Sequence, residues 1–247
     1  MTAATPRAWQ VVLDAVERDL LEGRLSPGDH LPPERSLAAD LGVGRSSVRE
    51  ALRVLEVLGL IRTAVGSGPS AGAIIVARPG GGMSALMRLQ VAAQGFPVAD
   101  VVKTRLILEG SIAAELAEAC RTADHRPDLS GPAQILTAME RSPITEAEFL
   151  ALDTQFHLSL AEASGNQVIT ATMAGLRSAI EGYARAGVAG LASWPATSAR
   201  LMLEHRGILR AVLAGEADAA RLAVHAHISG YYTETQLTST PPLPPTR

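Results

Sequence analysis

The sequence of 247 residues contains little cysteine, few aromatic residues and almost no lysine. Its single cysteine, Cys120, excludes a disulfide framework and any Cys-x-x-Cys metal or redox motif. Phe, Trp and Tyr make up only 3% of the chain, which favours helices over strands. The chain has no run of about 18 apolar residues, and its first ten residues lack the apolar core of a secretory signal. We therefore expect a soluble, cytoplasmic protein with no membrane contact.

The formal net charge of −3 comes from 22 basic and 25 acidic residues, and for the chain as a whole it weighs slightly against nucleic-acid binding. The distribution is uneven, however. Residues 1–78 carry nine arginines and nine acidic residues, so the acidic surplus lies entirely in the rest of the chain. The net charge is therefore no argument against DNA binding by the N-terminal third.

The run Arg78-Pro79-Gly80-Gly81-Gly82 breaks secondary structure and separates two regions of different pattern. We predict a first domain over residues 6–78 and a hinge-like linker over residues 79–82. A second domain is predicted over residues 83–236, and a disordered, proline-rich tail over residues 237–247.

The first region has the pattern of three helices followed by a hairpin. Apolar residues at helical spacing end at Gly23, and shorter helices are predicted over residues 33–41 and about 45–59. Two stretches with strand character follow, at residues 61–65 and 73–76. This order is the plan of a winged helix-turn-helix domain with a two-stranded wing.

The second region is predicted to be entirely helical. Its Ala- and Leu-rich segments are punctuated by proline and glycine, with approximate spans of 83–95, 97–122, 130–140, 145–163, 166–187, 194–214 and 216–236. The short connections favour an antiparallel bundle of six or seven helices. The expected fold class is therefore mainly α, with one small wing.

Arg45 and Arg49 lie four residues apart near the start of the third predicted helix and so share one face. With Ser46 and Ser47 beside them, this helix can enter the major groove, where arginine pairs with guanine and serine reaches bases or phosphates. Arg35, on the preceding helix, can hold the DNA backbone. The alternative is an ordinary surface helix whose arginines are partly paired with neighbouring glutamates.

The segment from Leu25 to Arg62 closely resembles the N-terminal domain of GntR-family transcriptional regulators. Its motifs are Pro-Gly-Asp-x-Leu-Pro-x-Glu-Arg, Leu-Ala and Val-Arg-Glu-Ala-Leu-Arg-x-Leu-Glu-x-x-Gly-Leu-Ile, in that order. The resemblance implies DNA contacts by six residues: Arg35, Arg45, Ser46, Ser47, Arg49 and Gly66. Gly44 replaces the serine usual in the family. The wing from Gly66 to Gly72 carries no Lys or Arg, so its contacts would rely on backbone N–H groups.

Asp153 and His157 share one face of a predicted helix, beside an apolar stripe. His205 and His227 lie on two later helices. One carboxylate and three imidazoles from three helices can converge in a bundle and bind a divalent metal, with coordination positions left open. The spacing alone leaves two other interpretations: an exposed Asp–His pair, and buried histidines that are satisfied within the core.

Residues 83–236 resemble the all-helical effector-binding domain of the FadR subfamily of GntR regulators. The matches lie in Arg105-Leu-Ile-Leu-Glu109, Asp153-x-x-x-His157 before Ser-Gly-Asn, Glu-His205-x-x-Ile and the closing His227-Ile. The resemblance implies a metal held by four ligands: Asp153, His157, His205 and His227. Such nitrogen and oxygen ligands fit Zn, Ni, Mn or Fe.

Two further residues are candidates for effector binding. By the same resemblance, Arg105 pairs with an effector carboxylate, which a guanidinium can hold through a charge-assisted fork. An ion pair with Glu109, four residues on, is the alternative role for Arg105. Asn166 is a candidate for the same site but is equally well explained as a helix cap after Gly165.

Together these observations predict a homodimeric, ligand-responsive transcriptional regulator, a repressor rather than an enzyme. We expect it to bind a short pseudo-palindromic operator in double-stranded DNA and to sense a small organic acid through the metal. One alternative is a metal-dependent hydrolase in which the Asp–His site activates water, although the sequence indicates no general base or substrate cleft. Another is a bundle whose metal is purely structural.

Overall fold

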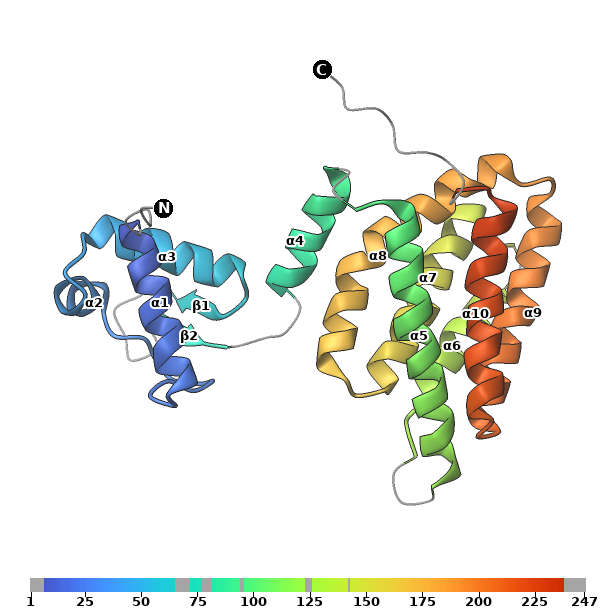
Figure 1. Ribbon diagram of the computed structural model, residues 1–247, viewed down its shortest axis with the longest axis horizontal. Coiled ribbons are helices and arrows are strands. Elements are labelled where there is room, and N and C mark those ends of the chain that lie inside the picture. The colour runs from blue at the N-terminus through green and yellow to red at the C-terminus, as the bar shows by residue number, and fades with distance from the viewer. Residues whose placement is uncertain are drawn as a thin grey trace, which may run out of the picture. The chain divides into compact units, whose positions relative to one another are not determined.

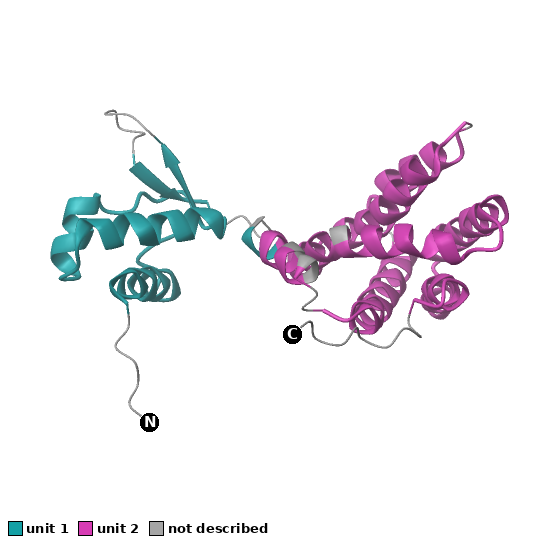
Figure 2. Cartoon of the chain, turned by 90° about the horizontal axis from the view of Figure 1, so that it is seen from above, with its two compact units in different colours: residues 1–83 teal, residues 84–247 magenta. Residues whose placement is uncertain are grey.

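The computed structural model describes residues 7–64, 72–76, 81–93, 96–122, 126–141 and 143–237. The chain forms two compact units, residues 1–83 and residues 84–247, shown in different colours in Figure 2. None of the described helices combines the length and apolar character needed to cross a membrane.

The first unit has the predicted winged helix-turn-helix order (Figure 1). Its elements are α1 (Ala8–Leu21), α2 (Glu34–Asp40), α3 (Arg45–Val57), β1 (Ile61–Ala64) and β2 (Gly72–Ile75). The two strands pair antiparallel, with Ile61 opposite Ile75 and Ala64 opposite Gly72. This pairing confirms the two-stranded wing predicted from the sequence.

Local sequence explains how the helices of this unit begin and end. Pro33 stands at the N-cap of α2, where its missing N–H costs nothing. Gly42, at φ +64°, makes the left-handed turn between α2 and α3 that other residues adopt only with strain. The apolar faces of the three helices and the strands enclose a single core, which includes Val12, Val16, Leu37, Val48, Leu52, Ile61 and Ile75.

The described residues from Gly81 onward form helices joined by short connections, as predicted. The helices are α4 (Gly81–Ala92), α5 (Val98–Arg121), α6 (Ser130–Met139), α7 (Glu146–Ala163), α8 (Gln167–Gly187), the short 3₁₀ helix Val188–Gly190, α9 (Trp194–Leu213) and α10 (Ala217–Glu234). Helix α4 begins at Gly81, so the last two residues of the expected linker are helical. Glycine weakens a helix by about 1 kcal/mol relative to alanine but does not forbid it. Residues 79–80 and 238–247 lie outside the described part of the chain.

Helix α5 runs through the middle of the second unit and packs against α7, α8, α9 and α10 (Figure 1). Its central position buries two of its charged side chains, Arg105 and Glu109. A capping box starts α7, because Thr145 Oγ1 accepts from the backbone N–H of Glu148 and Glu148 Oε2 accepts from that of Thr145. These elements place a group of polar side chains inside an otherwise apolar bundle.

Candidate functional site

Four polar side chains from three helices meet inside the bundle. Asp153 and His157 come from α7, His205 from α9 and His227 from α10, and each offers a ligand atom within 4.8 Å of the others. The exposed fraction of these side chains is 10% for Asp153 and 4% or less for the histidines. Burial therefore rules out an exposed Asp–His pair as the explanation for the motif on α7.

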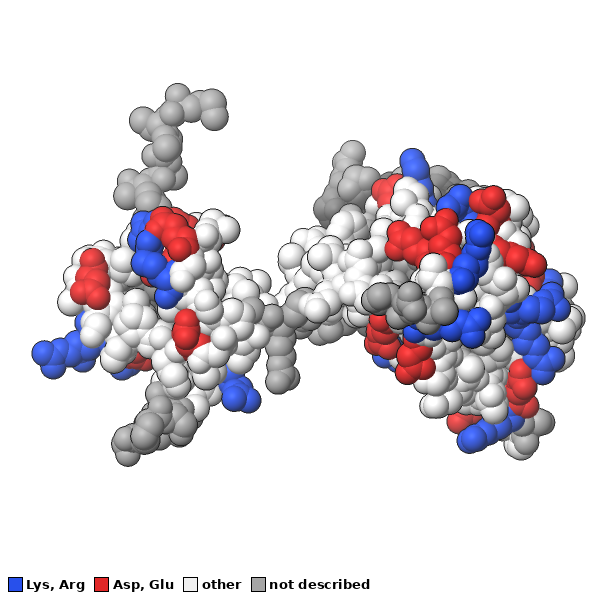
Figure 3. All heavy atoms as spheres, turned by 90° about the horizontal axis from the view of Figure 1, so that it is seen from below, with Lys and Arg blue, Asp and Glu red and all other residues white. Residues whose placement is uncertain are grey.

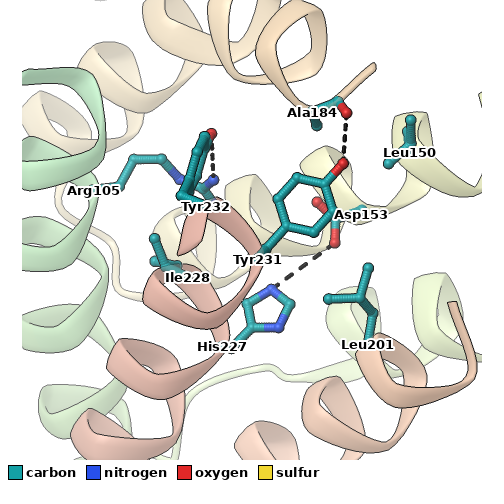
Figure 4. Close-up of a pocket in the computed structure, with 9 residues that line it drawn as sticks. All are labelled: Arg105, Leu150, Asp153, Ala184, Leu201, His227, Ile228, Tyr231 and Tyr232. Atoms are coloured by element: carbon teal, nitrogen blue, oxygen red, sulfur yellow. Dashed lines mark hydrogen bonds and ion pairs between the residues drawn. The ribbon is translucent and has the colours of Figure 1, made fainter. Parts of the chain in front are cut away.

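The ligand atoms face one another at short distances. The Nε2 atoms of His157 and His227 are 3.1 Å apart. The Oδ1 atom of Asp153 lies 3.1 Å from His205 Nε2 and 4.0 Å from His227 Nε2; Figure 4 marks the second of these contacts. A carboxylate oxygen and three imidazole nitrogens are thus directed at a common point, as in a transition-metal site.

Two of the imidazoles contact a carboxylate through Nδ1, the ring nitrogen on the side away from the cluster. His157 Nδ1 lies 2.5 Å from Glu109 Oε2, and His227 Nδ1 lies 2.8 Å from Glu204 Oε2. A carboxylate at Nδ1 favours the tautomer that leaves Nε2 bare, and this arrangement is usual behind metal-binding histidines. Both Nε2 atoms are therefore oriented as metal ligands.

His205 is the clearest sign that the site is incomplete without a metal. Its side chain is fully buried; within the described part of the chain Nδ1 makes no hydrogen bond, and Nε2 faces Asp153 Oδ1 at 3.1 Å without the geometry of a hydrogen bond. Buried polar atoms almost always have a partner, because leaving one without costs about 1–3 kcal/mol. A metal ion bound at Nε2 would supply that partner, so the donor set fits a divalent cation.

The electrostatics of the site favour the protonation states that a metal requires. Burial acts to raise the pKa of Asp153, but the neighbouring His205 keeps it below its ordinary value. Burial lowers the pKa of His205, and burial together with the charge of His205 lowers that of His227 to about 4. These shifts favour a carboxylate at Asp153 and neutral imidazoles at His205 and His227, the forms that coordinate metals.

A small cavity adjoins these ligands (Figure 4). It is lined by Arg105, Leu150, Asp153, Ala184, Leu201, His227, Ile228, Tyr231 and Tyr232. Its volume of about 10 Å³ is the room of a single water molecule. Two tyrosines form part of the wall: Tyr232 Oη accepts from Arg105 Nη1 at 3.5 Å, and Tyr231 Oη donates to the Ala184 carbonyl at 2.5 Å.

Arg105 belongs both to an ion pair and to the cavity wall. Its Nε donates to Glu109 Oε1 at 2.6 Å, which is the i,i+4 pair considered from the sequence. Burial acts against the charge of Arg105, but the carboxylate of Glu109 raises its pKa above the ordinary value. Its Nη2 is buried and has no partner among the described residues. The guanidinium thus keeps one donor available to an anion.

Asn166 is exposed and is not among the residues that line the cavity. It is the N-cap of α8, where its Oδ1 accepts from the backbone N–H groups of Val168 and Ile169, each at 3.1 Å. The geometry therefore supports the capping role for Asn166; its part in effector binding stays a prediction.

The predicted DNA-binding residues lie on the surface of the first unit. Arg35, Arg45, Ser46 and Arg49 are exposed and Ser47 is half-buried, while Gly66 lies outside the described residues. Arg45 is the first residue of α3, and Gly44 is its N-cap without a side-chain hydrogen bond.

Arg49 makes an ion pair with Glu34 of α2 rather than with a glutamate of its own helix. The distance from Arg49 Nε to Glu34 Oε2 is 2.8 Å, and the arginine side chain remains 61% exposed. Since Nε is the one Arg49 nitrogen paired among the described residues, the two terminal nitrogens can still reach a base or a phosphate.

The charged side chains on the surface of the second unit are mixed in sign and partly paired. On the face shown in Figure 3, acidic and basic side chains of the second unit are interspersed. Several are paired, such as Arg206 with Glu140 and Arg185 with Glu181. Exposed pairs of this kind contribute little to stability, and on this face the described residues form no continuous basic patch.

The structure adds four residues to the site that the sequence did not assign to it: Glu109, Glu204, Tyr231 and Tyr232. Glu109 was considered only as a partner for Arg105. The sequence could have indicated Tyr231 as a site residue, because it lies four residues after His227 on the same face of α10. No local signal indicated that Glu109 faces His157, since this depends on how α5 packs against α7.

The fold and site define a class: a winged helix-turn-helix domain joined to a helical domain with a buried cluster able to hold a metal. The model of the bacterial regulatory proteins of the gntR family matches residues 9–69, and that of the FCD domain matches residues 100–230. The chain belongs to the GntR family of transcriptional regulators, which are not enzymes. This assignment confirms the resemblance found in the sequence and removes the hydrolase alternative.

Individual relatives agree with this assignment. The chain is 31% identical over 220 residues to the Glc operon transcriptional activator of Escherichia coli, covering 89% of this chain and 85% of that protein. It is 33% identical over 174 residues to the HTH-type transcriptional repressor NanR of Klebsiella aerogenes, covering 68% of this chain and 63% of that protein. The solved structure of Streptococcus agalactiae GntR superposes with a TM-score of 0.59 at 26% identity, covering 91% of this chain and 98% of that one.

Proposed function

We propose that this protein is a metal-dependent, acid-responsive repressor that binds a short pseudo-palindromic operator as a homodimer. The observation that carries the proposal is the proximity of two groups. Asp153 and His227, two members of the cluster able to hold a divalent cation, line the same cavity as Arg105, whose Nη2 has no partner among the described residues. A cation and an arginine together form a site for a small anion.

The metal would be held by Asp153, His157, His205 and His227. When bound, it supplies a Lewis-acidic centre to which an oxygen ligand can coordinate. Four protein ligands of this kind fit Zn, Ni, Mn or Fe and would leave one or two coordination positions open for an incoming ligand. The protein residues provide orientation: Glu204 holds the ring of His227, and Glu109 contacts that of His157.

The effector that best fits this cavity is a small carboxylic acid. Arg105 Nη2 can donate to its carboxylate with a charge-assisted hydrogen bond. With room for about one water molecule, the cavity accommodates even a short acid only if a wall residue moves. Tyr231 is well placed to do so, since within the described part of the chain its hydroxyl makes one hydrogen bond, to the Ala184 carbonyl. Binding the acid therefore requires rearrangement on α10 next to a metal ligand.

DNA recognition is assigned to α3 and the helix before it. Arg45 and Arg49 are exposed at the N-terminal end of α3, which is the end that enters the major groove in helix-turn-helix proteins. Arg35 is exposed on α2. GntR-family regulators typically act as dimers, and two such heads read two half-sites of a symmetric operator.

Repression is the simpler mode of control for this architecture. Occupying an operator requires only the DNA-binding surface, whereas activation also needs a contact with the transcription machinery. The names of the relatives include an activator and a repressor. A reporter gene behind the operator distinguishes the two, because deletion of a repressor raises expression and deletion of an activator lowers it.

A thermal-shift screen tests the ligand assignment. Protein stripped with a chelator is reloaded with zinc and exposed to small 2-hydroxy acids and to matched alcohols without a carboxylate. We expect stabilisation by zinc, and further stabilisation by an acid only in the zinc-loaded sample, because a ligand that binds the folded state alone raises its stability. An acid response that is equal with and without zinc would contradict the shared site.

A further inference from the structure

Glu109 occupies a position between the two halves of the proposed site. It lies on α5, four residues after Arg105, and 4% of its side chain is exposed. Oε1 accepts from Arg105 Nε at 2.6 Å, and Oε2 lies 2.5 Å from His157 Nδ1. Neither Glu109 Oε2 nor His157 Nδ1 has another polar partner among the described residues. One buried carboxylate is thus shared by the cavity arginine and a metal-ligand histidine.

We propose that Glu109 is a positioning residue that orients the His157 ring for metal binding and links it mechanically to Arg105. This inference rests on the proposed function, since it assigns a role within the same site. Because the two oxygens of Glu109 hold different partners, a shift of Arg105 toward a bound carboxylate pulls on the group that holds His157. Binding of the metal and binding of the acid are then coupled through Glu109, in addition to any direct contact between the two ligands.

The arrangement of the second carboxylate supports a specific role for Glu109. Glu204 contacts His227 Nδ1 from α9, but its other oxygen contacts Arg200, whose side chain is 37% exposed and lies outside the cavity lining. Glu204 therefore links His227 to an arginine at the protein surface. Glu109 ties its histidine to the arginine that faces the cavity. Of these two carboxylates, only Glu109 contacts an arginine that lines the cavity, so Glu109 is the one whose position can change when an acid binds.

Removing Glu109 alone would leave Arg105 charged and unpaired in the core, which can unfold the protein. The test therefore compares Arg105→Met with the double variant Arg105→Met/Glu109→Met, because neither carries an unpaired arginine. Zinc affinity is measured by competition with a chromophoric chelator. We expect zinc to bind 10- to 100-fold more weakly to the double variant than to Arg105→Met, the usual effect of losing an outer carboxylate. Arg105→Met should itself lie between the wild type and the double variant.

Equal zinc affinity in the two variants would overturn the positioning role of Glu109. Equal affinity in wild type and Arg105→Met would overturn the link to Arg105. If the wild type binds no zinc, the proposed function fails rather than this inference. As a matched control, Glu181→Gln removes a surface i,i+4 ion pair with Arg185 and should leave zinc affinity unchanged.

A measurement on the unmodified protein covers the case in which the variants do not fold. Long-range ¹H–¹⁵N spectra of the zinc-loaded wild type identify which ring nitrogen of each histidine carries a proton and which binds the metal. Glu109 at Nδ1 predicts that His157 is protonated at Nδ1 and binds zinc through Nε2. Zinc bound at His157 Nδ1 would overturn the proposal.

Discussion

At the residue scale, the main feature of this protein is a set of ionisable side chains in positions that the helical pattern would give to apolar ones. Asp153 and His205 are buried between α7 and α9 although each costs free energy to remove from water. Such residues are retained where they serve a ligand or make compensating contacts. The compensation within the described residues is partial, because both nitrogens of His205 lack a hydrogen bond.

The metal assignment predicts the effect of removing one ligand. Replacing His205 by Ala should abolish stoichiometric metal binding, because it removes an imidazole from the centre of the cluster. Elemental analysis of the purified protein measures this directly. His225→Ala is the matched control, since His225 is exposed on α10 two residues from His227, and it should retain the metal. Full metal content in the His205 variant would refute the ligand set.

The DNA assignment makes a second prediction at this scale. Arg45→Ala and Arg49→Ala should each weaken specific DNA binding by about 1–3 kcal/mol if each arginine reads a base. Fluorescence anisotropy with an operator selected from random DNA by the protein itself provides the measurement.

Arg185→Ala serves as the control for DNA binding, because it removes an exposed arginine of the same charge from α8 in the second unit. It should bind the operator as the wild type does. Wild-type affinity in both the Arg45 and Arg49 variants would show that α3 is not the recognition helix.

At the scale of elements, the sequence was informative where proline, glycine and capping residues set the ends of helices. Gly165, at φ +71°, follows α7, and Pro97 precedes α5, both close to the predicted limits. The exception is α4, which extends back to Gly81 through residues expected to form a linker.

Contacts between helices were less predictable than the helices. The i,i+4 spacing places Asp153 beside His157 on α7 and Arg105 beside Glu109 on α5. Whether Glu109 meets His157 depends on the rotation of α5 against α7, which a pattern within one helix does not specify. The sequence therefore predicted the metal ligands through a family resemblance, and it left their supporting carboxylates unassigned.

Asn166 provides a test at this scale that separates two roles. As the cap of α8, Asn166→Ala should reduce the free energy of unfolding by about 0.5–2 kcal/mol, measured by urea denaturation. Asn166→Ser, which keeps a capping oxygen, should restore most of the loss. Neither variant should change the thermal response of the zinc-loaded protein to acids. A lost acid response with unchanged stability would instead identify Asn166 as an effector-binding residue.

At the scale of the whole molecule, the chain consists of two units with separate apolar cores. Under the proposed function, DNA reading and ligand sensing belong to different units of the chain. This means that ligand binding acts on DNA affinity through a coupling free energy, which is about 1–3 kcal/mol in typical allosteric proteins.

Metal loading should stabilise one unit selectively. A zinc concentration 100 times the dissociation constant stabilises the state that binds it by about 2.7 kcal/mol. In calorimetry, zinc should therefore raise the unfolding temperature of the helical unit above its value with a chelator. The unfolding temperature of the winged unit should stay the same. A separate scan of the isolated winged domain would show which of the two transitions belongs to it. An equal shift of both transitions would contradict a metal site confined to the second unit.

The central claim is that the metal-bound site in the helical unit controls DNA binding by the winged unit. The most direct measurement is the operator affinity of zinc-loaded protein with and without an acid that stabilises it in the thermal screen. The account predicts that the acid weakens operator binding by about 5- to 150-fold, and that this effect disappears in the His205→Ala variant. Operator affinity that stays the same when the acid is bound would contradict the account.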